Sequence, residues 1–65
     1  MKFYVTDSND GFTTFEADII EEVAAELAYD HERYGLDWQY CTATDDEECA
    51  LYYIYPDGAV DVIPL

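Results

Sequence analysis

The fold of this chain turns on "DIIEEVAAELAYDHERYG", residues 18–35, which has the spacing of an α-helix. Apolar and aromatic residues of one helical face recur at Ile20, Val23, Ala24, Leu27, His31 and Tyr34. Asp18 followed by Glu21 is typical of a capping box at a helix start. Gly35 is suited to the position just after a helix end. The stretch therefore predicts a helix over residues 19–34, with Asp18 and Glu21 as structural caps.

A β-hairpin is expected before this helix. "KFYVT" (residues 2–6) and "FTTFEA" (residues 12–17) are rich in β-branched and aromatic residues. "DSNDG" (residues 7–11) between them has the Asp, Asn and Gly residues that tight turns favour.

Three further strands are expected after the helix. "DWQYCTAT" (residues 37–44) and "CALYYIY" (residues 49–55) are joined through the acidic turn "DDEE" (residues 45–48). "PDG" (residues 56–58) is a strong turn signal, and "AVDVI" (residues 59–63) follows as the last strand, which Pro64 ends.

The order ββαβββ predicts an α+β fold, in which one antiparallel sheet carries a single helix packed on one face. Sixty-five residues make one domain, residues 1–65. A domain of this size buries only about 60% of its unfolded surface, so the core is small.

Charge is the outstanding property of the composition. Sixteen Asp and Glu oppose only Lys2 and Arg33, for a net charge of −14, whereas about 2–8 in magnitude is usual for a small domain. Direct binding to nucleic acid or anionic lipid is disfavoured, because both require Lys and Arg. A positively charged protein surface is the favoured partner.

The expected compartment is the cytoplasm. No apolar leader segment is visible at the start, and the longest apolar run is far shorter than the roughly 20 residues that span a bilayer. Cys41 and Cys49 are then expected to be reduced, although a disulfide across the hairpin is possible under oxidising conditions.

Catalysis and cofactor binding find no support in the sequence, and the protein is expected not to be an enzyme. No carboxylate pair stands out, and His31 is expected to be a packing residue. Residues 7–18 resemble a calcium loop, but Gly11 falls at the fifth position instead of the sixth. Cys41, Cys49 and His31 do not form a zinc pattern, so neither metal nor cofactor is expected.

Two groups of carboxylates are the candidate binding residues. The first group follows one stripe of the helix at i, i+4, i+8. Like charges at that spacing destabilise a helix, so we expect a binding function that offsets this cost. The second is the acidic turn, beside which Tyr52 is a candidate contact residue. The candidates are Glu22, Glu26, Asp30, Asp45, Asp46, Glu47, Glu48 and Tyr52.

Strand alternation limits how many tyrosines can be on the surface. Leu51, Tyr53 and Tyr55 share one face of their strand, while Tyr52 and Ile54 share the other. One of these two sets lines the core, and the sequence alone leaves open which one.

The segments "DIIEEVAAELAYDHE" and "TDDEEC" are strongly acidic. Through them the chain resembles, in composition, the small acidic inhibitor proteins of bacteriophages and mobile elements, several of which mimic DNA. Among these the anti-CRISPR proteins are the nearest in size. The resemblance implies an inhibitor, monomeric or weakly dimeric, that evades host defence by occupying the nucleic-acid-binding surface of a CRISPR effector. Two alternatives stay open: an immunity or antitoxin protein that plugs a basic nuclease, and a halophilic domain whose charge serves only strong salt.

Overall fold

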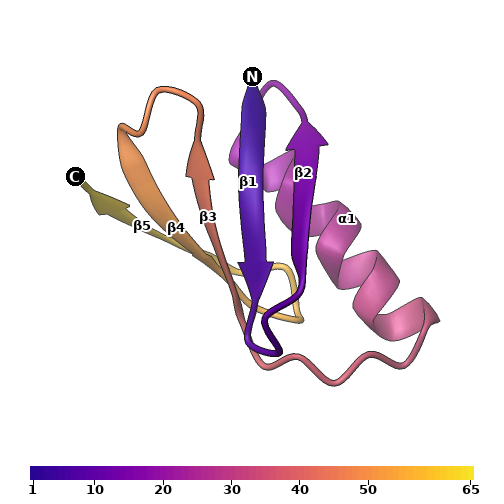
Figure 1. The fold of residues 1–65 in the computed structure, drawn as a ribbon. Helices are drawn as coiled ribbons and strands as arrows, with labels where there is room; N and C mark the ends of the chain where they lie inside the picture. Colours follow the sequence, from indigo (N-terminus) through magenta and orange to yellow (C-terminus); the bar gives the residue numbers. More distant parts are fainter.

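The segments before and after the helix join into one five-stranded antiparallel sheet. The computed structural model describes all 65 residues (Figure 1). Its elements are β1 (Lys2–Asp7), β2 (Phe12–Glu16), α1 (Ile20–Arg33), β3 (Cys41–Asp45), β4 (Ala50–Ile54) and β5 (Val60–Pro64). The strand order across the sheet is β2-β1-β3-β4-β5, and α1 lies on one face. The predicted α+β fold and the order ββαβββ are confirmed.

The expected strand over residues 37–44 begins later, at Cys41. Residues 37–40 are irregular because their backbone bonds to the β1–β2 turn instead of to a strand. The Gln39 N–H donates to the Ser8 hydroxyl at 2.8 Å, and the Ser8 N–H donates to the Tyr40 carbonyl at 2.9 Å. These hydrogen bonds therefore hold the segment between α1 and β3 against the β1–β2 turn.

The helix begins without the predicted capping box. Its N-cap is Ile19, in an extended conformation and with no side-chain cap. Instead, Glu22 Oε1 accepts a hydrogen bond from the Asp18 N–H at 3.2 Å. At the other end the prediction holds, since Tyr34 is the C-cap and Gly35 follows in the left-handed region, at φ +60°.

The core lies between α1 and the face of the sheet that it covers. Nine buried residues form it: Phe3, Val5, Ile20, Val23, Ala24, Trp38, Cys41, Ala43 and Ile54. His31 has the expected packing role. Its ring meets Trp38 edge-on, with centroids 4.6 Å apart, and its Nε2 donates to the Trp38 carbonyl at 3.1 Å.

The two cysteines are free and lie far apart. Cys41 is buried opposite Ile54, whereas Cys49 is exposed just before β4. The register separates them by five strand positions, or about 16 Å at the usual rise per residue. The structure thus excludes a disulfide between them in this fold.

The single helix, α1, is neither long nor apolar enough to cross a membrane.

Cys41 makes the stability of the fold sensitive to alkaline pH. Burial, and then the charge of Asp7, raises the pKa of its thiol from 9.0 to about 11. Between pH 9 and 11 the unfolded thiol loses its proton while the folded one keeps it, so the unfolded state gains stability. We expect the free energy of unfolding to fall by about 2 kcal/mol over this window, as measured by urea denaturation.

Cys41→Ala is the control for this prediction. It removes the thiol but leaves every tyrosine in place, so its stability should decline less steeply between pH 9 and 11. Equal slopes in the two proteins would contradict a role for the buried thiol.

Candidate protein-binding surfaces

Seven exposed carboxylates gather at one end of the molecule, which we call the acidic end. β2 ends there, α1 begins there, and the β3–β4 turn lies beside them (Figure 1). Two backbone hydrogen bonds hold these segments to the start of β1: Ala17 N–H to Met1 O and Asp46 N–H to Lys2 O, each 3.0 Å. The acidic end consists of Glu16, Asp18, Glu21, Glu22, Asp46, Glu47 and Glu48.

Asp45, predicted as a binding residue, does not belong to this exposed set. It is the last residue of β3 and only 4% exposed. Its Oδ1 accepts the N–H groups of Glu47 at 3.1 Å and of Cys49 at 3.2 Å. The carboxylate therefore shapes the turn that presents its neighbours, and it is not available to a partner.

The helical stripe is divided between two regions. Glu22 lies at the acidic end, and Glu26 is exposed in the middle of α1. Asp30 lies about 12 Å further along the helix axis than Glu22. It is half-buried and lines a cavity of about 160 Å³ beside Trp38 and Cys41. The structure thus brings Glu22 together with the acidic turn and separates Asp30 from both.

Tyr52 lies on the helix-facing side of the sheet, which corrects its expected place as a surface contact. It is half-buried and packs against Phe3, with ring centroids 6.0 Å apart and planes at 74°. Burial, followed by the nearby charge of Asp45, raises the pKa of its hydroxyl. Of the two sets that alternation left open, the one with Tyr52 and Ile54 faces the core.

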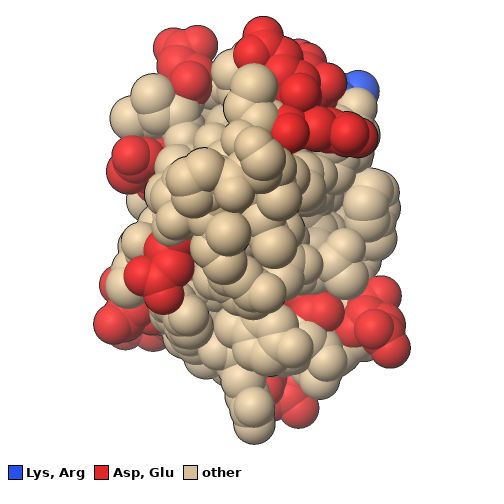
Figure 2. All heavy atoms as spheres, turned by 90° about the vertical axis from the view of Figure 1, so that its left-hand side faces the viewer, with Lys and Arg blue, Asp and Glu red and all other residues tan.

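At the opposite end of the molecule, carboxylates serve the turns. Asp7 Oδ1 accepts the N–H groups of Asn9 at 2.8 Å and of Gly11 at 2.9 Å. Asp37 Oδ1 accepts Asn9 Nδ2–H at 2.8 Å. A Cβ at Gly11 would collide with the Asp7 carboxylate, so a larger residue there would have to displace the group that accepts these turn N–H bonds. On the side that carries β4 and β5, acidic atoms lie at both ends and along one edge, around an uncharged centre (Figure 2).

No group of three or more His, Cys, Asp or Glu side chains is arranged to hold a metal ion. The exposed carboxylates of the acidic end are therefore best described as a charged surface and not as a coordination site.

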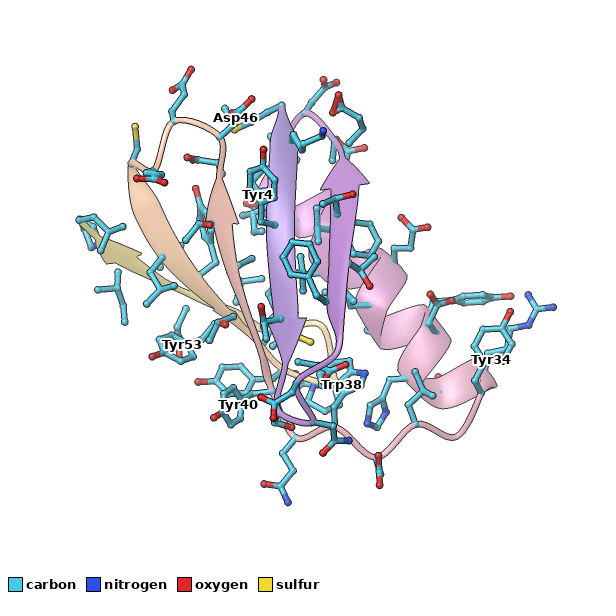
Figure 3. All side chains as sticks on the ribbon, in the orientation of Figure 1. Tyr4, Tyr34, Trp38, Tyr40, Asp46 and Tyr53 are labelled. Carbon is cyan, nitrogen blue, oxygen red and sulfur yellow. The ribbon has the colours of Figure 1, made fainter.

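A second surface, which the sequence analysis missed, is the face of the sheet turned away from α1; we call it the outer face. The strand register places its side chains in two rows of five, with the pair Lys2 and Glu16 beside them at the acidic end. The rows are Thr14–Tyr4–Thr44–Leu51–Ile63 and Phe12–Thr6–Thr42–Tyr53–Asp61. Tyr40 lies against Tyr53 at one end of the face, with ring centroids 6.2 Å apart (Figure 3). Strand alternation was the available signal, but it could not show which set faced away from the helix.

Comparison with protein-family models, with curated proteins and with solved structures found no match to this chain. Its function is therefore argued from the chemistry of these two surfaces.

The buried Asp45 supplies a test of how the acidic turn is built. We expect Asp45→Ala to lower the free energy of unfolding by about 2–4 kcal/mol, because two backbone N–H groups lose a charged acceptor. Asp46→Ala removes the same charge from an exposed position and should change stability little. Urea denaturation of both variants measures the difference, and equal stabilities would show that Asp45 does not organise the turn.

Proposed function

We propose that this protein is an inhibitor that binds the nucleic-acid-binding surface of a basic protein in place of nucleic acid. The supporting observation is its charge density. The backbone extends 32 Å along its longest axis, and the net charge of the chain is −14. Duplex DNA carries about one charge per 1.7 Å of axis, or about 19 over the same length. The chain thus has about three quarters of the linear charge density of DNA.

The acidic end is the part that we propose faces the basic groups of the target. Its carboxylates come from β2, α1 and the β3–β4 turn, which the sheet and two backbone hydrogen bonds hold in place. A scaffold that is ordered before binding loses little conformational entropy in the complex. Complementary charge also accelerates association and disfavours partners that are not basic.

The target that we favour is a CRISPR effector in the host cytoplasm, which makes the protein an anti-CRISPR inhibitor. Such an effector has a positively charged channel and Arg or Lys side chains that read a short duplex motif. Occupying either one would stop target binding without catalysis. Strong self-association is disfavoured because each copy carries the same large negative charge. A nuclease as the target would instead favour the immunity or antitoxin alternative, and the captured protein decides between them.

Capture with DNA competition tests the proposal. The immobilised protein, incubated at about 0.15 M salt with lysate of a strain carrying a CRISPR system, should retain a basic nucleic-acid-binding protein. Excess duplex DNA should release it, because both ligands occupy the same surface. Capture that DNA leaves unchanged would contradict mimicry.

The same assay locates the binding surface when charge-reversal variants are compared. Asp46→Lys/Glu47→Lys should weaken binding tenfold or more, through slower association and lost charge pairing. Asp10→Lys/Glu32→Lys makes the same change in net charge at exposed positions on the opposite end. An equal loss in both variants would show that net charge alone, and not the acidic end, determines binding.

Salt dependence separates this proposal from the halophilic alternative. We expect the circular dichroism of a folded α+β protein at 50 mM NaCl, with little change at 2 M NaCl. Screening by molar salt should raise the melting temperature, since it relieves repulsion among exposed carboxylates. A chain unfolded at 50 mM that gains structure only toward molar salt would favour adaptation to salt.

A further inference from the structure

The outer face of the sheet is unusual for a chain so rich in charge. Nine of the ten positions in its two rows are uncharged, whereas 28% of all residues are charged. An antiparallel sheet with one solvated face normally makes that face polar. Here Tyr4, Phe12 and Ile63 are 38%, 64% and 44% exposed. Exposed apolar side chains that gather on one face mark interaction surfaces.

A shallow hollow lies on this face between aromatic and threonine side chains. Its volume is about 220 Å³, the space of about seven water molecules. Tyr4 and Phe12 supply rings at its border, and Thr6, Thr42 and Thr44 supply hydroxyl groups. Hydroxyl oxygens can accept hydrogen bonds, and the rings offer π faces. The hollow therefore combines acceptors with aromatic surface and contains no basic group.

Charge decides among the possible occupants. Within its two rows the one charged position is Asp61, whose Oδ2 accepts the Tyr55 hydroxyl at 3.0 Å. Beside the rows, at the acidic end, Lys2 is paired with Glu16 and lies among carboxylates that outnumber it. A second copy of the chain would bring another fourteen negative charges toward the face, and an anionic ligand would likewise be repelled. A cationic partner is attracted by the carboxylates near this face, which outnumber Lys2.

Among cationic side chains, arginine matches the surface better than lysine. A guanidinium is planar, weakly hydrated and carries five donors, so it can stack on tyrosine and donate to hydroxyls at once. Within this chain, the only arginine already binds in that manner. The Arg33 guanidinium lies 5.7 Å from the Tyr29 ring centroid and 5.4 Å from that of Tyr34, and it donates to the Tyr29 hydroxyl at 3.0 Å.

We propose that the outer face is the second contact surface of the inhibitor and binds arginine side chains of the basic partner. Tyr4, Phe12 and Tyr53 provide the stacking rings, while the threonine hydroxyls accept guanidinium N–H groups. The carboxylates at both ends attract the partner, and the outer face selects arginine over lysine. This assignment rests on the proposed function and specifies the chemistry of the surface that the target presents.

Titration of the ¹⁵N-labelled protein with hexa-arginine and hexa-lysine peptides at 0.15 M NaCl tests this assignment. With hexa-arginine we expect amide shifts at Tyr4, Thr42, Thr44 and Tyr53, and at least threefold tighter binding than with hexa-lysine. With hexa-lysine the shifts should be confined to residues near the carboxylates, because an ammonium stacks less well on the rings.

Tyr4→Thr/Tyr53→Thr should abolish the arginine preference, with folding checked by circular dichroism, since threonine retains β-propensity. Tyr34→Thr, whose ring already contacts Arg33, is the control and should retain it. Equal affinity for both peptides, or shifts only at the carboxylate-rich ends, would overturn the assignment.

These peptides probe the outer face without the target. DNA-displaceable capture combined with no arginine preference would therefore overturn this assignment alone. Arginine preference without DNA-displaceable capture would remove the nucleic-acid-mimic role and support only the arginine-binding surface.

Discussion

The structure depends on one constraint, which is that a single helix must cover a sheet of five strands. A helix with its side chains is about 10 Å across, whereas five strands span about 19 Å from first to last. The helix can bury only part of one face, and the core is accordingly built from β1, β3, β4 and α1, with Trp38 from the segment before β3. Val62 on the helix-facing side of β5 remains 55% exposed, and the outer face receives no cover at all. The apolar surface is thus exposed because one helix covers less area than five strands present.

The same constraint explains where the carboxylates can stand. With so small a core, sixteen carboxylates are tolerated only if nearly all of them remain in contact with water. The loops and helix ends provide that water contact for most of the acids and bring them to the two ends of the sheet, whereas Glu26 and Asp61 are exposed between the ends. Asp45 is the buried exception, and two backbone N–H groups satisfy it. At the opposite end, Asp7 likewise accepts two turn N–H groups. Carboxylates here act both as the charged surface and as the turn-forming groups of the fold.

The sequence was most informative where the governing interactions are local. Helical periodicity and turn residues predict the order ββαβββ, and Gly35 marks the end of α1. Three features depended on contacts distant in the chain and could not be predicted. The irregular path of residues 37–40 follows from hydrogen bonds to Ser8. The position of Tyr52 required knowing which side of β4 meets the helix. The burial of Asp45 required knowing that β3 continues to that residue, opposite Phe3 on β1.

The sheet is open at both edges, because β2 and β5 each pair on one side only. Open edges with exposed apolar residues such as Val62 and Ile63 invite intermolecular strand pairing, and Pro64 and Asp61 offer β5 only local protection. Mutual repulsion between copies is the main safeguard, and it disappears near the isoelectric point of about 4.1. Acidification toward this pH would therefore remove the repulsion that keeps the open edges of neighbouring molecules apart. We propose that the negative charge attracts a basic partner. The same charge also keeps copies of the protein from assembling with one another.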